Sequence, residues 1–364
     1  MPQSHASQSG PSSRDRFRPT TSLDMLKLRA QWLAAIRQFF DDRGYFEVDT
    51  PVLSRDRAID ANLLPFVTRW NPAGEPLSLR EPASSGDDLF LQTSPEFAMK
   101  RLLAAGADAI YQLGHVFRNG EVGQWHNPEF TMLEWYRVGD THLDQLEVVE
   151  KLVSSLLLLP EVLEHRRHVA PAEGGTRSTG RFTRTTYQAA FERHVGVNVL
   201  KEPTSELSRI AADRGIVAPP GLRADDRDGW LNLLLALLVE DKLGRDQPEF
   251  LYDYPATQAA LARVRSDDPP VAERFELYLD GVEICNGYHE LTDVDELRRR
   301  IENESATRVA TDRGPLPHDS LLLSAMEAGL PPCAGVALGV DRLLQVAVKA
   351  RSISEVVPFP FGRA

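Results

Sequence analysis

The sequence predicts an α+β fold in which an antiparallel sheet is flanked by helices. Two stretches alternate like paired strands: residues 110–137, interrupted by a polar loop, and residues 271–290, interrupted by Asp280-Gly281. Aspartate followed by glycine between two alternating runs is a strong signal for a two-residue hairpin. Residues 23–40 instead repeat their apolar positions with helical spacing, as expected for a helix that covers such a sheet.

The composition restricts the class of protein. Of 364 residues, 42% are hydrophobic and 26% are charged, which is typical of a globular protein in water. The longest apolar run, around residues 233–239, is too short to cross a bilayer, and the N-terminus lacks the order of a signal peptide. We therefore expect a cytoplasmic protein with no membrane partner. Two cysteines provide neither a disulfide framework nor a zinc cluster, and the net charge of −12 argues against a broad nucleic-acid-binding face.

The N-terminal region divides into a tail, a helix and a short strand. Residues 1–21 are predicted to be a disordered tail, which leaves no room for a domain before the helix. The helix at 23–40 ends before Gly44, and residues 45–51 form a strand broken by proline. The apolar stripe of the helix comprises Leu28, Trp32, Ile36, Phe39 and Phe40. On a lone domain this stripe would be exposed, so we expect it to form a homodimer interface together with the strand that ends at Pro51.

Two flexible inserts and several helices are predicted around the strands. Residues 71–88 are rich in proline and glycine, residues 164–183 are rich in Arg, Gly, Thr and Ser, and residues 89–92 resemble a strand. Apolar periodicity predicts helices at 143–159, 186–194, 204–214 and 226–243. This middle region contains no sequence motif that indicates a reaction or a ligand.

A further helix is predicted at residues 93–105. Ser94 is expected to cap it, Pro95 to occupy its first position and Glu96 to lie in its first turn, which together form a strong start signal. Glu96 is therefore explained equally well as a residue that compensates the helix dipole.

The strand pair at 110–137 brings three chemical types onto one surface. Arg118 ends the first strand, and the period-2 rule places Phe130, Glu134 and Tyr136 on one face of the second. Arginine suits a nucleotide phosphate, an exposed aromatic ring suits a purine, and an acid suits a substrate cation. The alternative is an ordinary hairpin with a surface arginine.

The hairpin at 271–290 places two acids close together. With the turn at Asp280-Gly281, Glu276 is expected to pair with Cys285, so that Glu276 and Glu283 are diagonal neighbours roughly 7–8 Å apart. Two carboxylates at this spacing can hold one divalent cation, although a structural role is the alternative. Strict alternation places Glu290 on the opposite face unless a bulge at Gly287 redirects it.

The segment 334–343 is predicted to be a strand of small residues that runs into a helix near Asp341. Its glycines permit the close approach of a ligand, and Arg342 in the first helical turn is placed to meet a phosphate. Tight packing of the helix on the strand explains the same glycines.

Taken together, these motifs resemble the class II aminoacyl-tRNA synthetases, in their lysyl branch. The three class signatures are the long helix with its strand and Pro51, then Phe117-Arg118 through HNPEFTMLEWY, then Gly339-Val340-Asp341-Arg342. Within that branch, TSPEFAMKRLL, VAERFELYLDGVEICNGYHELTD and GVALGVDRLL resemble the elongation factor P–lysine ligases, which are lysyl-tRNA synthetase paralogues without an anticodon-binding domain. The resemblance covers residues 22–362, which we expect to form one catalytic domain.

The resemblance implies an ATP site with magnesium and a site for lysine or (R)-β-lysine. Arg118 would contact the α-phosphate, Arg342 the γ-phosphate or its neighbour, and Phe130 would stack on adenine. The remaining ATP-site residues would be Asn119, Gly120, His126, Asn127, Ile284, Gly339 and Glu283, and magnesium would be held by Glu276 and Glu283. The amino-acid site would comprise Ser94, Pro95, Glu96 at the backbone-type amine, Glu134, Tyr136 and Glu290 at the side-chain amine, Asn286 and Ala337.

The implied activity is an AMP-forming ligation. The substrate carboxylate attacks the α-phosphate in line to form an adenylate, so positioning and charge neutralisation suffice without a covalent enzyme nucleophile. The acyl group then passes to a lysine side chain of elongation factor P. Two alternatives stay open: a short synthetase that charges tRNA or another small acceptor, and a catalytically silent paralogue. The acidic balance argues against tRNA, and the arginines of the second insert are expected to touch a protein acceptor or to stay solvated.

Three positions depart from the pattern of the family. Gly120 stands in place of a glutamate, with Glu121 adjacent, and Gln124 stands in place of an arginine, so the affinity for ATP and the ordering of its loop are open. Ala337 stands where lysyl-tRNA synthetases usually have glycine. We expect its methyl group to influence the choice between α-lysine and β-lysine.

Overall fold

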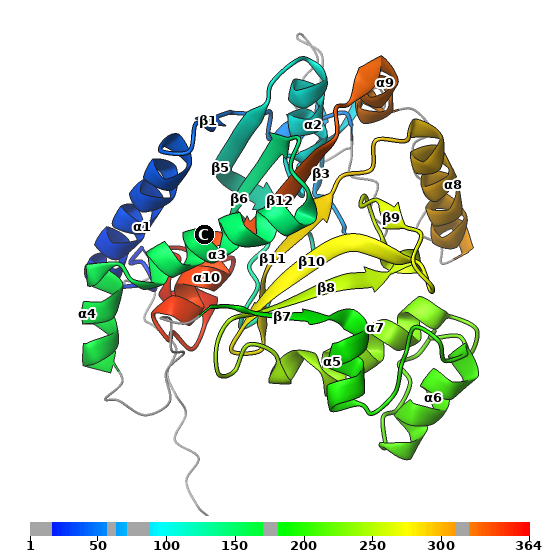
Figure 1. Cartoon of the computed structure of the whole chain (residues 1–364). Coiled ribbons are helices and arrows are strands. Elements are labelled where there is room, and N and C mark those ends of the chain that lie inside the picture. Colours follow the sequence, from blue (N-terminus) through cyan, green and yellow to red (C-terminus); the bar gives the residue numbers. More distant parts are fainter. Residues whose placement is uncertain (1–16, 57–62, 71–86, 170–180, 311–319) are drawn as a thin grey trace, which may run out of the picture.

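The computed structural model describes residues 17–56, 63–70, 87–169, 181–310 and 320–364. A nine-stranded sheet forms the centre of this part of the chain (Figure 1). Its strands follow the order β1-β5-β6-β12-β11-β10-β8-β7, and β9 pairs with β10. Their bounds are β1 Phe46–Glu47, β5 Ala109–Phe117, β6 Glu129–Val138, β7 Thr183–Thr186, β8 Glu249–Pro255, β9 Val264–Arg265, β10 Val271–Leu279, β11 Val282–His289 and β12 Cys333–Gly339. Both predicted antiparallel pairs, β5 with β6 and β10 with β11, are confirmed.

The sheet is antiparallel through its centre, as predicted, and is parallel at each of its two ends. Strand β1 runs parallel to β5, and β7 runs parallel to β8. Parallel neighbours cannot be joined by a tight turn, and in each case other elements lie between the two strands in the chain.

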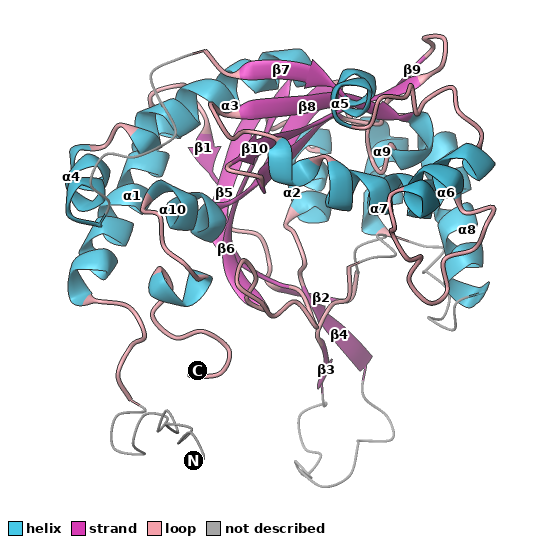
Figure 2. Ribbon diagram, turned by 90° about the horizontal axis from the view of Figure 1, so that it is seen from below, coloured by secondary structure: helices cyan, strands magenta, loops and turns pink. Residues whose placement is uncertain are grey.

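A second sheet of three strands projects from the body of the molecule (Figure 2). It consists of β2 Leu53–Ser54, β4 Asp87–Leu91 and β3 Val67–Trp70. The strand predicted at 89–92 is confirmed as β4, but β4 also includes the last two residues of the insert expected at 71–88. Residues 71–86 lie outside the described residues.

Helices cover the central sheet in three groups (Figure 1). Helices α1 Leu23–Asp41, α3 His142–Leu157, α4 Pro160–Val169 and α10 Val340–Ala347 form the first group, α2 Glu96–Ala104, α8 Val294–Ala310 and α9 Leu321–Gly329 the second, and α5 Tyr187–His194, α6 Thr204–Asp213 and α7 Arg227–Leu238 the third. Short 3₁₀ turns occupy Glu240–Lys242, Ala256–Gln258 and Ile353–Glu355. The predicted helices are confirmed within a few residues. None of the described helices is both long and apolar enough to cross a membrane.

The apolar stripe of α1 is buried within the single chain. Trp32, Ile36 and Phe40 are completely covered, and the ring of Phe40 stacks on Tyr111 of β5 with ring centroids 4.9 Å apart. Ser22 begins the helix by accepting a hydrogen bond from the backbone N–H of Met25. Our reason for expecting a dimer is therefore wrong, because this stripe forms part of the hydrophobic core.

Two segments that we expected to be flexible are tied to the fold. Thr20 and Thr21, assigned to the tail, hydrogen bond to backbone groups near the C-terminus, at Pro358 and Glu355. Residues 164–169 of the second expected insert belong to α4. Residues 1–16 and 170–180 lie outside the described residues.

Two arginines in or next to the second insert make internal contacts. Arg166 donates a hydrogen bond to the carbonyl of Ala347, and Arg184 lies 3.5 Å from the carboxylate of Glu150. These contacts join α4 to the end of α10 and β7 to α3. These two arginines are therefore not free for a protein acceptor, whereas Arg167 and Arg181 are exposed.

Candidate active site

A cavity of about 1040 Å³ opens on one face of the central sheet. Nearly all of the predicted site residues line it: Ser94, Pro95, Glu96, Arg118, His126, Asn127, Phe130, Glu134, Tyr136, Glu276, Glu283, Ile284, Asn286, Glu290, Ala337, Gly339 and Arg342. Asn119 and Gly120 are not among the lining residues. The backbone N–H of Asn119 donates to the carbonyl of Leu64, and Gly120 adopts a positive φ of 87° in the turn after β5.

The register of the β10–β11 hairpin differs from the predicted one by one residue. Glu276 pairs with Asn286 rather than with Cys285, because Ile284 is an extra residue in β11. The side chain of Ile284 is buried at the cavity wall. A bulge of this kind leaves one residue unpaired and reverses the facing of every residue after it.

This bulge decides where Glu290 points. Counted from Glu283, strict alternation places Glu290 on the far face, but the extra residue moves Asn286 and Glu290 onto the cavity side. The bulge does not lie at Gly287, as we had considered, since Gly287 pairs regularly with Phe275. Glycine is required there for another reason: a Cβ atom would lie 2.3 Å from the ring of Phe275.

One end of the cavity is built around a buried lysine. The ammonium of Lys100 lies 2.6 Å from a carboxylate oxygen of Glu96 and 2.6 Å from one of Glu290. Lys100 and Glu290 are almost completely buried. Although burial opposes its charge, the carboxylates of Glu290 and Glu96 raise the pKa of Lys100, so it remains an ammonium. We did not predict this residue from the sequence, although its spacing of four from Glu96 in a helix is a usable signal.

Glu134 completes this end of the cavity. Its carboxylate accepts hydrogen bonds from the hydroxyls of Tyr136, at 2.6 Å, and Ser94, at 2.7 Å. The Ser94 hydroxyl also accepts a hydrogen bond from the backbone N–H of Glu96 at 3.1 Å, although the N-cap position belongs to Pro95 and the helix begins at Glu96. Gly335 leaves room for this arrangement, since a Cβ atom there would lie 2.2 Å from the ring of Tyr136.

The charges at this end leave an excess of two negative charges. Three carboxylates, Glu96, Glu134 and Glu290, surround the single ammonium of Lys100. Burial raises the pKa of Glu134 to about 7, and the nearby Glu96 contributes to the increase. Burial also raises the pKa of Glu290 to about 8. Ionised, the group has a charge of −2, which complements a ligand with two ammonium groups. We name these residues, with Ser94 and Tyr136, the amine end.

The opposite end of the cavity carries arginines. Arg342, in the first turn of α10, lies 2.6 Å from Nε2 of His126 and 3.6 Å from the carboxylate of Glu283, and it donates to the carbonyl of Glu283. Burial, together with Arg342 and Arg118, lowers the pKa of His126, so its neutral ring accepts the hydrogen bond from Arg342. Arg118 lies over the ring of Phe130 at 5.2 Å from the centroid. Within the described part of the chain, Nε of Arg118 has no hydrogen-bond partner. We name Arg118, His126, Phe130, Glu283 and Arg342 the phosphate end.

The loop between β5 and β6 is held by the C-terminal segment. Gln124, one of the residues that depart from the family pattern, donates to the carbonyl of Arg351, and its own carbonyl accepts from the N–H of Ile353. The side chain of Asn127 accepts from the N–H of Phe361. Gln124 thus orders the loop by contacts within the chain.

A third acid, Glu240, lies near Glu276 and Glu283, the two predicted magnesium ligands. Glu276 accepts hydrogen bonds from Arg274 and from the hydroxyl of Tyr278, whereas the side chain of Glu283 is 43% exposed to the cavity. Burial and the charges of Glu276 and Glu283 raise the pKa of Glu240 to about 7. Crowded carboxylates of this kind fit a divalent cation, which prefers oxygen ligands and relieves their repulsion.

Comparison with known proteins gives a consistent assignment. A sequence model of the tRNA synthetases of class II (D, K and N) matches residues 15–363. The chain is 44% identical over 347 residues to an elongation factor P–(R)-β-lysine ligase from Erwinia tasmaniensis, covering 95% of this chain and 98% of the relative. It is 43% identical over 350 residues to a protein of the same name from Klebsiella pneumoniae, covering 96% and 98%. The chain therefore belongs to the class II tRNA synthetase family.

Proposed function

We propose that the chain activates lysine or (R)-β-lysine with ATP and transfers it to a lysine side chain of elongation factor P. The observation that carries this proposal is the amine end, whose charge of −2 matches the two ammonium groups of either amino acid. The names of the relatives support the acceptor and the β-amino acid. We place the reaction in the cytoplasm, within one catalytic domain at residues 22–362.

In this proposal the two ends of the cavity bind different parts of the two substrates. The amine end binds both ammonium groups of the amino acid, so that its carboxylate points toward the phosphate end. There, Arg118 and Arg342 neutralise the phosphates of ATP, and arginine suits this role because its charge is permanent and its fork binds two oxygens. A magnesium ion held by Glu276 and Glu283 would neutralise further phosphate charge. The carboxylate oxygen bonds to the α-phosphorus as pyrophosphate leaves, and the acceptor amine then displaces AMP to form an amide.

The test is a transfer reaction with two possible acceptors, elongation factor P and tRNA. We would incubate the protein with ATP, magnesium and (R)-β-lysine, and then measure the intact mass of elongation factor P. We expect the mass of one lysyl group to be added, in a bond stable to acid. Glu134→Gln should reduce this transfer, because it removes one charge from the amine end. Efficient charging of tRNA with an unmodified elongation factor P would contradict the proposal, and so would the absence of ATP–pyrophosphate exchange with any lysine isomer.

The homodimer remains a proposal on different evidence. Strand β1 is the end strand of the central sheet, and Phe46, Val52 and Leu53 near it are large apolar side chains that are exposed on the single chain. An unpaired strand edge with apolar neighbours is suited to pairing with a second copy. Sedimentation at micromolar concentration should show a dimer, and a monomer alone would refute it.

A further inference from the structure

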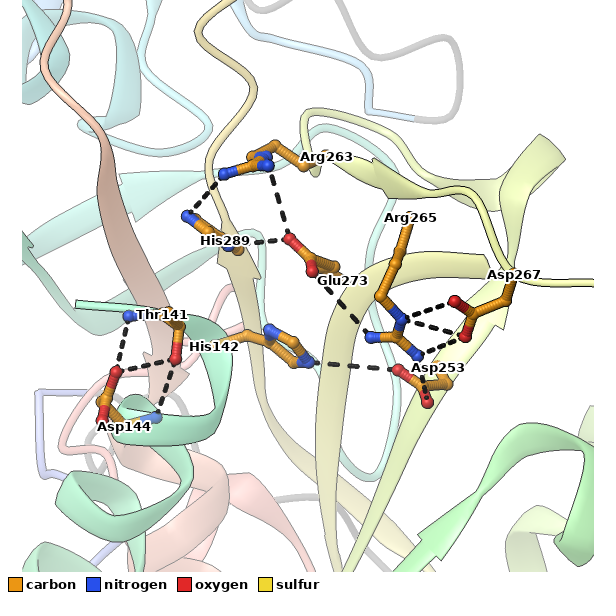
Figure 3. A network of polar contacts seen from close by, with 9 residues as sticks. All are labelled: Thr141, His142, Asp144, Asp253, Arg263, Arg265, Asp267, Glu273 and His289. Carbon is orange, nitrogen blue, oxygen red and sulfur yellow. Dashed lines mark hydrogen bonds and ion pairs between the residues drawn. The ribbon is translucent and has the colours of Figure 1, made fainter. Parts of the chain in front are cut away.

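A second polar cluster lies where the start of α3 meets β10 and β11 (Figure 3). It contains His142 at the start of α3, Glu273 on β10 and His289 at the end of β11. His289 is the strand neighbour of Glu290, which lines the active-site cavity, so alternation directs the two side chains to opposite faces. One potential ligand atom from each of the three residues lies within 4.8 Å of the other two.

His142 is the reason to look for a ligand here. Its side chain is only 3% exposed, and among the described residues neither of its ring nitrogens has a hydrogen-bond partner. An imidazole buried in this way loses its hydrogen bonds to water without replacement, which is costly unless something else binds it. His289 already meets a second member of the cluster, since its Nδ1 lies 2.7 Å from a carboxylate oxygen of Glu273.

The geometry points to a site for a divalent transition metal ion of the zinc type, bound by His142, Glu273 and His289. Two imidazoles and one carboxylate are a common ligand set for Zn²⁺, with a fourth position open for water. Tetrahedral bonds of about 2.0–2.1 Å place ligand atoms about 3.4 Å apart, so the three side chains need to move by about an ångström or less. The sparse cysteines had led us to expect no zinc cluster, but this site requires none.

The surrounding residues provide an outer shell for such an ion. Nε2 of His142 faces Asp253 of β8 at 3.9 Å, and the facing oxygen of Asp253 also has no hydrogen-bond partner among the described residues. In Figure 3 the other ring nitrogen, Nδ1, lies on the side of Glu273 and His289. With the metal on Nδ1, the Nε2–H group can donate to Asp253, which is the usual carboxylate–histidine–metal arrangement.

Two arginines compete for the same acids. Arg263 lies 3.2 Å from Nε2 of His289 and 3.8 Å from Glu273, and Arg265 lies 3.9 Å from Glu273. Both side chains are partly exposed, at 49% and 36%, so they can turn toward solvent when an ion enters. Arg265 also has Asp253 and Asp267 as partners at 2.9 and 2.8 Å. The three acids and two arginines leave one negative charge before the ion binds.

Such an ion would join the start of α3 to β10 and β11. Glu276 of β10 and Glu290, which directly follows β11, line the active-site cavity on the other face. The site is therefore structural, and it does not depend on the proposed function. Imidazole ligands favour Zn²⁺ or Co²⁺ over Mg²⁺, so the ion would be distinct from the one at the phosphate end.

The experiment uses the full chain after removal of metals by a chelator. Titration with Zn²⁺ in a calorimeter should show one ion per chain with a micromolar or lower Kd, and Co²⁺ should give the visible absorption of a tetrahedral site. A hundredfold excess over Kd should raise the Tm by about 3 °C. Mg²⁺ should produce none of these changes.

Variants assign the site to its residues. His142→Gln and Glu273→Gln should each weaken Zn²⁺ binding at least tenfold and remove the Co²⁺ absorption. The matched control is the double variant His165→Gln/His168→Gln on the surface of α4, which should bind as the parent does. A parent protein that binds neither ion below millimolar concentration would overturn the inference, even if a variant fails to fold. Unchanged Co²⁺ absorption in His142→Gln would overturn it as well.

Discussion

The two ends of the active-site cavity differ in how completely they are built before a ligand arrives. At the amine end, Glu134, Glu290 and Lys100 are buried, and each has a charged or hydrogen-bonding partner within the chain. At the phosphate end, Glu283 is partly exposed, and Arg342 contacts a ring nitrogen and a carbonyl. The amine end is thus part of the folded core, whereas the phosphate end holds positive charge ready for a ligand. We expect substitutions at the amine end to affect stability and substrate binding together. Substitutions at the phosphate end should affect catalysis alone.

Lys100→Met should have the largest effect of the substitutions described here. It tests the expectation that the amine end contributes to the stability of the fold. The substitution leaves Glu290 buried without its cation, which costs about 3–5 kcal/mol of unfolding free energy. Chemical denaturation measures this loss. The matched control is Lys151→Met, which breaks a surface ion pair with Glu147 and should cost less than about 1 kcal/mol. Equal losses in the two variants would show that the amine end is not a preformed part of the core.

Arg118→Ala tests the expectation that the phosphate end affects catalysis and not stability. Its guanidinium contacts Phe130 and has an unpaired Nε among the described residues, so the free energy of unfolding should stay near that of the parent. Removal of a positive charge aimed at the reacting phosphate should lower kcat/KM for pyrophosphate exchange about 10²–10³-fold. Arg118→Lys should recover only part of this loss, because lysine lacks the fork. A variant with lost stability but full activity would reverse the comparison.

Glu283→Gln examines the magnesium assignment at the phosphate end. Loss of one ion ligand should largely abolish exchange, by about 10²-fold or more, with a Tm near that of the parent. Added magnesium should restore part of the activity, and this rescue separates a metal role from a structural one. If exchange continues at the parental rate, Glu283 does not bind the ion.

The amine end should also bind its substrate in a pH-dependent way. With pKa values of Glu134 near 7 and Glu290 near 8, the free site holds protons at neutral pH. A ligand with two ammonium groups requires the ionised carboxylates, so binding releases protons. Its affinity should rise from pH 6 to pH 8 by up to about tenfold per unit for each proton released. Calorimetry across this range checks the sign, and an affinity that falls with pH would contradict it.

Ala337→Gly should have the smallest effect. Ala337 pairs with Glu134 on one side and Asn286 on the other, so its methyl group lies between two site residues. Its removal should shift the preference from β-lysine toward α-lysine by about tenfold, the scale for one methyl group in a pocket. The ratio of kcat/KM for the two amino acids measures this. An unchanged ratio would exclude the role.

Much of the site was predictable because its residue types follow local rules. Alternation along β6 placed Phe130, Glu134 and Tyr136 on one face, and the Asp280-Gly281 turn located the β10–β11 hairpin. Arg342 lies in the first turn of α10, as the change from strand to helix indicated. The bulge at Ile284 was not predictable, because the packing of β11 between β10 and β12 selects it.

The sequence by itself determined the order of strands and helices, the family and the chemical types at the site, since these depend on periodicity and on motifs within a few residues. Only the tertiary structure decided the environment of the acids. Glu96, Glu134 and Glu290 come from α2, β6 and the end of β11, and their pKa values depend on burial and on one shared lysine. The same holds for His142, Glu273 and His289. Burial and distance between remote segments arise only when the sheet has formed, because they are properties of the packed chain rather than of any stretch of it.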